Sequence, residues 1–175
     1  MTAPLHNVLF ICTGNSARSI IAEGLLNQLG SSRFKAFSAG SHPKGAVNPY
    51  ALETLGTLHI EDRGYSSKSW GEFAKEGAAP MDFVITVCDQ AAGEMCPVWP
   101  GQPVTAHWGI PDPAAVADDG TGMRMLAFRD ALRMLERRIE LFLALPIASL
   151  DRIALKREAD AIGRLRPDAV ADRAS

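Results

Sequence analysis

The chain has 175 residues, of which 47% are apolar and 22% charged, as expected for one globular domain large enough to bury a core. Its formal net charge of −2 provides no electrostatic basis for binding nucleic acid or an anionic membrane. No apolar run is long enough to span a bilayer, and the first residues lack the basic and apolar regions of a signal peptide, so we expect a cytoplasmic protein.

The first predicted elements are a buried strand over 8–11, a polar loop that begins at Cys12, and a helix from Ser19. The loop has the spacing Cys-x5-Arg-Ser. Its amides and the helix N-terminus form a cradle for an oxyanion and favour the thiolate of Cys12, while a guanidinium binds two oxygens of such an anion. We therefore predict Cys12 as a nucleophile, with an oxyanion site made by Thr13, Gly14, Asn15, Ser16, Ala17, Arg18 and Ser19. A structural core thiol beside a surface arginine is the alternative.

The remaining elements follow from the spacing of apolar residues. We predict an amphipathic helix from residue 19 that ends at Gly30, a strand over 34–40, a helix over 48–59 and a short helix over 66–75. Two buried strands, 82–88 and 104–108, are separated by a polar loop over 89–97. Apolar residues three and four positions apart from Met125 to Phe142 predict a long helix that covers the sheet and ends before Pro146. Residues 147–175 carry a weaker stripe, typical of a short appended helix.

Cys12 and Cys88 each stand at the end of a predicted buried strand. In an open parallel sheet the carboxyl ends of the strands line the binding crevice, so both thiols are expected there. Asp112-Pro113 follows the last predicted strand in a loop that could lean over the same crevice. Taken alone, this pair is more typical of an ordinary turn than of an acid.

The segment 12–19 resembles the phosphate-binding loop of the low-molecular-weight protein tyrosine phosphatase superfamily. Within it, Thr86-Val-Cys88-Asp, Cys96-Pro97 and His107-Trp-Gly109 before Asp112-Pro113 resemble the thioredoxin-coupled arsenate reductases. The likeness covers residue 6 to about 145. It implies an α/β fold with a four-stranded parallel sheet, doubly wound, with helices on both faces. We accordingly divide the chain into a phosphatase-like arsenate reductase domain, 1–146, and a C-terminal helical extension of unknown role, 147–175.

The resemblance implies that Cys12 attacks arsenate, that Arg18 clamps it and that Asp112 protonates the leaving oxygen. It also implies a disulfide relay through Cys88 and Cys96, which an external dithiol such as thioredoxin or glutaredoxin would reduce without a bound cofactor. Phosphate or sulfate would bind as analogues of arsenate.

Two alternatives use the same cradle. A low-molecular-weight tyrosine phosphatase would act through a phosphocysteine and needs only the nucleophile, the clamp and the acid. It would also want aromatic residues directly after the Asp-Pro, where Ala114 and Ala115 stand. A non-catalytic oxyanion sensor would leave the two extra thiols unexplained.

Asn15, Glu23 and Ser38 match positions at which some similar reductases bind potassium, and Lys68 falls at the place of the fourth ligand. We therefore expect the Lys68 ammonium to contact Asn15 and Glu23 directly and to replace the cation. No zinc or other metal site is predicted, because the cysteines and histidines lack the Cys-x2-Cys and His-x3-His spacings of such sites.

Overall fold

The computed structural model describes residues 4–166. Its elements, in chain order, are β1 (His6–Cys12), α1 (Arg18–Leu29), β2 (Phe34–Gly40), α2 (Pro49–Gly56), the 3-10 helix η1 (Trp70–Phe73), β3 (Phe83–Thr86), α3 (Asp89–Ala92), β4 (Val104–His107), η2 (Pro113–Ala115), α4 (Met123–Leu143), η3 (Ile147–Ser149) and α5 (Arg152–Gly163).

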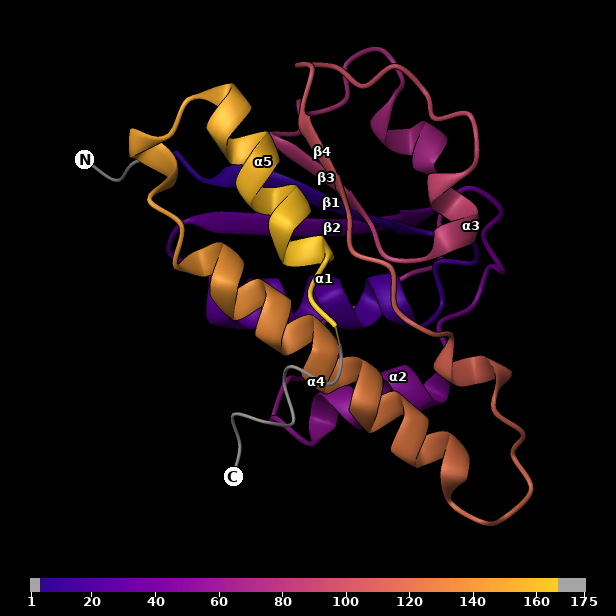
Figure 1. Cartoon of the computed structure of the whole chain (residues 1–175). Helices are drawn as coiled ribbons and strands as arrows, with labels where there is room; N and C mark the ends of the chain where they lie inside the picture. The colour runs from indigo at the N-terminus through magenta and orange to yellow at the C-terminus, as the bar shows by residue number, and fades with distance from the viewer. Residues whose placement is uncertain (1–3, 167–175) are drawn as a thin grey trace.

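The four strands form one parallel sheet in the order β2-β1-β3-β4, which confirms the predicted doubly wound α/β fold (Figure 1). The chain moves outward from β1 to β2 and then returns to place β3 on the other side of β1. The loops after β1 and β3 therefore leave the sheet at the point where the winding direction reverses. In folds of this kind, ligands bind at that point. These two loops carry Cys12 and Cys88.

The two faces of the sheet are covered unequally. The long helices α1 and α4 lie on one face with α2 packed outside them, and η1, α3 and irregular segments lie on the other (Figure 1). On the helical face, the ring of Phe142 in α4 contacts those of Phe34, Phe83 and Trp108 at centroid distances of 5.1, 5.0 and 5.7 Å. Because the opposite face has short elements only, the segment after Cys88 is held by few packing contacts.

Several predicted elements differ from the observed ones. The stretch 66–75 forms only a single 3-10 turn at its centre, and the predicted polar loop 89–97 begins with the helical turn of α3. The helix predicted over 48–59 ends at Gly56, although Asn48 caps it as expected by accepting a hydrogen bond from the Tyr50 N–H. The prediction that α1 is amphipathic was wrong. This helix lies between the sheet, α2 and α4, and a methyl group on Gly24 would already contact Leu55 at 2.9 Å, so most of its sides are buried.

The predicted C-terminal extension contains η3 and α5, and its residues 167–175 lie outside the described part of the chain. Helix α5 lies along the outer edge of β4, where Lys156 Nζ donates to Thr105 O (2.5 Å). The Trp108 indole N–H, from the next residue after β4, donates to Ala159 O (2.9 Å). An edge strand exposes unpaired backbone groups, and α5 covers those of β4. None of the described helices has the length and apolar character needed to cross a bilayer.

Candidate active site

The loop between β1 and α1 is held from outside by its carbonyl groups. Three of them accept backbone hydrogen bonds from the segment after β2: His42 N–H donates to Thr13 O (2.9 Å), Lys44 N–H to Gly14 O (3.0 Å) and Asn48 N–H to Ser16 O (2.9 Å). In a trans peptide the C=O and the following N–H point in opposite directions, and the chain has no cis peptide among its described residues. The N–H groups of residues 14, 15 and 17 therefore point into the loop, as an oxyanion cradle requires.

A chain of side-chain hydrogen bonds connects this loop to the nucleophile. Asn15 is fully buried with φ of 44°, a conformation that asparagine tolerates better than most residues. Its Nδ2 donates to Ser19 Oγ (2.8 Å), and Ser19 Oγ lies 3.0 Å from Cys12 Sγ. Since the amide nitrogen can only donate, the Ser19 hydroxyl keeps its own proton for the sulfur. A hydrogen bond to sulfur stabilises a thiolate more than a thiol, which suits a nucleophile.

Arg18 is the first residue of α1, and its side chain is 16% exposed. Its guanidinium donates to Ile110 O (3.1 Å) and lies 3.7 Å from the Asp112 carboxylate. Asp112 also caps η2 by accepting a hydrogen bond from the Ala114 N–H (3.0 Å). The structure thus brings together the predicted nucleophile, clamp and acid, with the acid held at the pocket mouth by the short helix that follows it.

These groups surround a pocket of about 220 Å³, lined by Cys12, Thr13, Gly14, Ser16, Ala17, Arg18, His42, Lys44, Gln90, Asp112 and Ala114. Lys44 and His42 are not among the predicted site residues. They add two potential cations to a pocket for an anion, and their position after the carboxyl end of β2 was the available signal. No Phe, Tyr or Trp side chain is among the residues that line this pocket.

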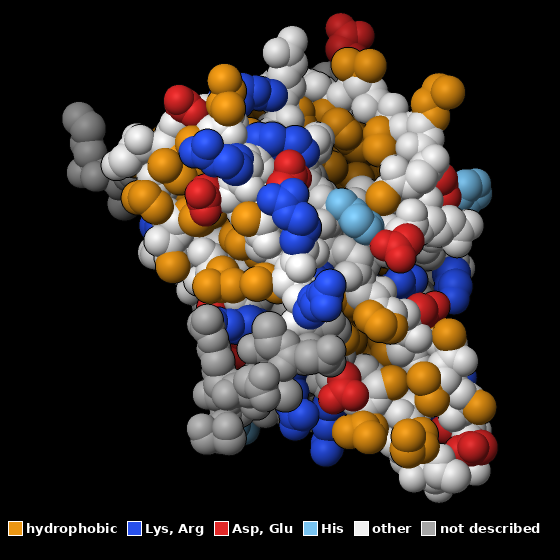
Figure 2. Space-filling view, viewed as in Figure 1, with side chains coloured by type: hydrophobic (Ala, Val, Ile, Leu, Met, Phe, Trp, Pro, Cys, Tyr) orange, Lys and Arg blue, Asp and Glu red, His pale blue; other side chains and the backbone are white. Residues whose placement is uncertain are grey.

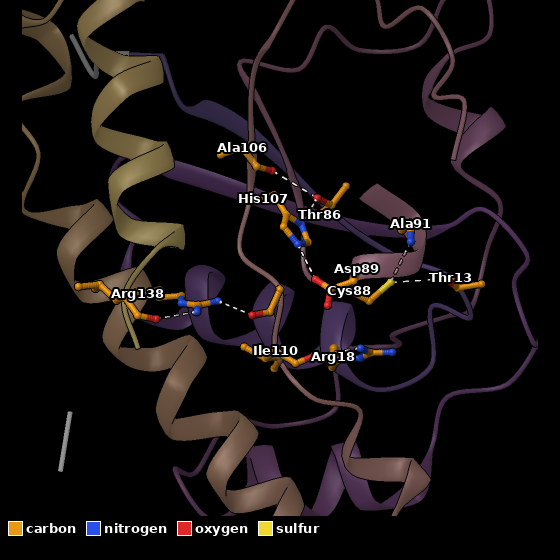
Figure 3. A network of polar contacts seen from close by, with 12 residues as sticks. Thr13, Arg18, Thr86, Cys88, Asp89, Ala91, Ala106, His107, Ile110 and Arg138 are labelled. Atoms are coloured by element: carbon orange, nitrogen blue, oxygen red, sulfur yellow. Dashed lines mark hydrogen bonds and ion pairs between the residues drawn. The ribbon is translucent and has the colours of Figure 1, made fainter. Parts of the chain in front are cut away.

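Cys88 lies two residues beyond β3 and is 2% exposed. Its sulfur lies 3.4 Å from Thr13 Oγ1, the side chain next to the nucleophile (Figure 3). It also accepts a hydrogen bond from the Ala91 N–H (3.4 Å) and so caps α3. A buried second thiol therefore contacts the loop that carries the first.

Cys96 is not among the residues that line this pocket. It is exposed, and all three cysteines are reduced. Partial burial and the negative charge of Glu94 raise the pKa of the Cys96 thiol. Its side chain lines a second cavity, of about 450 Å³, on the less covered face of the sheet. Direct exchange between Cys96 and Cys88 therefore needs a rearrangement of the segment between them.

The predicted supporting residues lie together beside the loop, but the predicted contacts of the Lys68 ammonium are not present. Ser38 Oγ donates to Glu23 Oε2 (2.6 Å), and burial raises the pKa of Glu23 despite this bond and the nearby Lys68 charge. The Lys68 ammonium bonds neither Asn15 nor Glu23. It donates to Ser66 O (2.8 Å), and the Lys68 backbone N–H donates to Asn15 Oδ1 (2.9 Å) instead. A main-chain N–H thus donates to Asn15 where the side-chain ammonium was predicted to do so. Residue type does not predict a contact of this kind.

A thiolate that attacks a tetrahedral oxyanion within an amide cradle is the chemistry of a cysteine-dependent phosphatase-type enzyme. The sequence matches the low-molecular-weight phosphotyrosine protein phosphatase family over residues 7–158, and the chain belongs to this family of enzymes. The match continues past residue 146 into α5.

Relatives with related sequences and structures are named as arsenate reductases. The arsenate reductase of Halalkalibacterium halodurans is 33% identical over 136 residues, which are 77% of this chain and 93% of that protein. A solved structure of an arsenate reductase in the phosphate binding state has a TM-score of 0.66 at 26% identity and covers 80% of this chain and 98% of its own. The thioredoxin-dependent arsenate reductase of Corynebacterium glutamicum gives 0.54 at 27% identity and covers 81% and 65%.

Proposed function

We propose that this protein reduces arsenate to arsenite through a relay of Cys12, Cys88 and Cys96, and that an external dithiol protein such as thioredoxin or glutaredoxin restores the thiols. The observation that carries the proposal is the position of Cys88, whose buried sulfur contacts Thr13 beside the nucleophile. Hydrolysis of a phosphate ester needs no second thiol at this place. The names of the similar proteins agree with arsenate as the substrate.

In the first step, the Cys12 thiolate attacks arsenic while the loop amides and Arg18 hold the arsenate oxygens. A sulfur–arsenic bond forms and an arsenic–oxygen bond breaks. The departing oxygen takes its proton from Asp112, whose carboxyl group lies at the pocket mouth. Arsenic is still As(V) at this stage, because the thiolate has only replaced an oxygen ligand.

The second step transfers the electrons. The Cys88 thiolate attacks Cys12 Sγ, the sulfur–arsenic bond breaks, and its electron pair stays on arsenic, which leaves as arsenite. The two sulfurs together lose two electrons and form the Cys12–Cys88 disulfide. Cys96 then attacks Cys88, releasing the Cys12 thiolate and forming a Cys88–Cys96 disulfide, which the external dithiol reduces by exchange. Thiols supply both electrons, so the proposed reaction uses no bound cofactor.

A phosphatase acting on aryl phosphates is the second candidate, because Cys12, Arg18 and Asp112 would also serve that reaction. The lining of the pocket argues against it: no Phe, Tyr or Trp side chain lines the pocket to hold a phenyl ring, and Ala114 is one of the residues that line it. A small inorganic oxyanion needs no such wall. The pocket therefore favours arsenate over an aryl ester.

The test compares cysteine variants in two assays, arsenate reduction with thioredoxin and hydrolysis of an aryl phosphate. Cys12→Ser should end both activities. Cys88→Ser should end reduction and leave any hydrolysis unchanged, because water rather than a thiol resolves a phosphocysteine. Cys96→Ser should complete about one turnover and then stop as a Cys12–Cys88 disulfide, visible by mass spectrometry. Full arsenate turnover by both Cys88→Ser and Cys96→Ser would disprove the relay. Efficient hydrolysis of phosphotyrosine without arsenate reduction would disprove the reductase.

A further inference from the structure

His107, the last residue of β4, contacts the first residue of α3. It pairs in register with Thr86 at the end of β3, so both side chains lie on the same face of the sheet. The imidazole Nδ1 lies 2.7 Å from Thr86 Oγ1, and Nε2 lies 2.7 Å from Asp89 Oδ1 (Figure 3). A carboxylate can only accept, so Nε2 carries the hydrogen and donates it to Asp89. The ring is thereby fixed at both nitrogens between the sheet and the residue that follows Cys88.

The backbone beneath this contact leaves no room for a side chain. A methyl group on Gly109 would lie 2.5 Å from Asp89 Oδ1 and 2.6 Å from His107 Nε2. Gly109 is not in the left-handed region, so its lack of a side chain answers a need for space and not for an unusual backbone angle. These three residues therefore pack closely, and a side chain at position 109 would disturb the His107–Asp89 contact.

Little else holds the start of α3 in place. This helix has four residues, and so short a helix is not stable by itself. The Asp89 side chain is 95% exposed and gains nothing from packing. Further support comes from Cys88, whose sulfur accepts the Ala91 N–H and contacts Thr13, and from the fully buried Ala91 side chain. Just past the helix, Glu94 lies 3.7 Å from His42 Nδ1. The Cys88 sulfur must leave its position when it forms disulfides.

The segment after α3 lies over open space. Trp99 anchors its far end by packing against Trp70 at a centroid distance of 6.3 Å. Between these ends, Met95 and Val98 are 95% and 91% exposed. The cavity of about 450 Å³ that Cys96 and Trp99 line lies under this segment, and Figure 2 shows it as an apolar hollow beside the charged side chains of α5. The segment therefore has room to rearrange once α3 is released.

We propose that His107 is a positioning residue that holds α3 closed through Asp89 and keeps Cys88 buried against Thr13. The Cys88–Cys96 exchange then requires this contact to open. The inference rests on the relay of the proposed function, since only a relay needs Cys88 to move from the pocket to Cys96.

The test measures how fast iodoacetamide alkylates Cys88 when it is the only thiol, in the full chain carrying Cys12→Ser and Cys96→Ser. A buried thiol reacts only when its segment opens, so the rate reports the opening equilibrium. His107→Ala and Gly109→Ala should each raise the rate about fivefold or more, as loss of one hydrogen bond predicts. His107→Gln should restore the parent rate within about twofold, because its amide can replace Nε2–H as the donor.

Two matched controls separate this effect from general loosening. His59→Asn removes an exposed histidine, and Gly56→Ala adds a methyl group where nothing lies within 4 Å. Both should alkylate at the parent rate. The melting temperature of each variant should stay near that of the parent, since a merely structural role of His107 would lower it in proportion to the rise in alkylation.

Alkylation rates of His107→Ala and Gly109→Ala that equal the parent rate would overturn the proposal. If His107→Ala does not fold, Asp89→Ala removes the same contact from an exposed position and carries the same expectation. The assay contains no arsenate and needs no turnover. It therefore gives its answer even if the protein proves not to be a reductase, and an inactive relay cannot be mistaken for a failed positioning role.

Discussion

The two cysteine-bearing segments, 12–18 and 88–96, are built in opposite ways. In the first, the carbonyls are tied to a neighbouring segment, and Asn15, Ser16 and Ser19 are buried. In the second, a four-residue helix leads into the half-buried Glu94 and then into Met95, which is 95% exposed. Stabilising charge on an oxyanion requires donors that are already in place, whereas disulfide exchange requires a sulfur that can reach two partners. The rigidity of segment 12–18 therefore suits oxyanion binding, and the loose packing of segment 88–96 suits the disulfide exchange proposed for it.

One short segment connects the two. Within residues 107–112, His107 contacts Asp89 and Ile110 O accepts a hydrogen bond from Arg18 (Figure 3). Asp112 forms an ion pair with the same arginine. The carbonyl of Gly109, in between, accepts a hydrogen bond from the buried Arg138 of α4 (3.2 Å). The predicted clamp Arg18 and the first residue of α3 therefore both contact the chain that leaves β4, which also carries the predicted acid Asp112.

The largest effect is expected from the rigid segment. Arg18→Lys should lower kcat/KM for arsenate on the order of 10²–10³-fold, because an ammonium cannot present two parallel donors to an oxyanion. Steady-state kinetics on the folded variant measure this. Kinetics close to those of the unsubstituted protein would disprove the role of Arg18 as a clamp. The contrast between segments 12–18 and 88–96 would then lose its main functional support.

A second substitution tests how tightly the loop 12–18 packs against Gly40 at the end of β2. Gly40→Ala would place a methyl group 2.5 Å from Thr13 O and 3.0 Å from Asn15 N, and backbone atoms cannot move aside cheaply. We expect a loss of about 1–3 kcal/mol in unfolding free energy and reduced arsenate turnover. Gly56→Ala, with open space around it, serves as the control and should be neutral or slightly stabilising. Equal behaviour of the two variants in urea denaturation would show that the cradle is not rigid.

A third prediction concerns pH and the buried carboxyl beside the cradle. Burial raises the pKa of Glu23, so its contribution to stability is fully present below the unfolded-state value and is lost as the pH rises through the folded-state value. Glu23→Gln cannot ionise and should therefore gain stability relative to the unsubstituted protein between pH 4 and pH 7, on the order of 1 kcal/mol. Urea denaturation at both values measures the gain. The exposed Glu53→Gln is the control, and a larger gain at pH 4 would contradict the sign.

The smallest effect is expected for potassium, which should leave the activity nearly unchanged. The positive charge of Lys68 is close enough to lower the pKa of Glu23. A potassium ion beside the loop would therefore contribute little further stabilisation to this carboxylate. Replacing sodium by potassium at constant ionic strength should change kcat/KM for arsenate by less than about twofold. A stimulation of several-fold would show that a cation binds at Glu23 after all, even though Lys68 lies nearby.

The sequence determined the parts of this protein whose chemistry is contiguous. The loop 12–19 could be recognised because its amides, thiol and guanidinium follow one another along a single strand–loop–helix unit, whose geometry is local. The buried strands and α4 were predictable from the spacing of apolar residues, since each position that faces the core must carry an apolar side chain. Even there, the prediction that α1 is amphipathic was wrong, because its outer side is buried only after α2 and α4 pack on it.

Tertiary structure decided the rest. The contact between His107 and Asp89, the cavity under Cys96, and the use of the Lys68 backbone amide in place of its ammonium depend on which segments meet after folding. Residues that meet in this way carry no common spacing in the chain. Every residue except proline also has a backbone N–H donor, so no sequence pattern predicts which of these donors will be used. The loose packing of segment 88–96 was also decided by the tertiary structure, because it depends on which other segments pack against it.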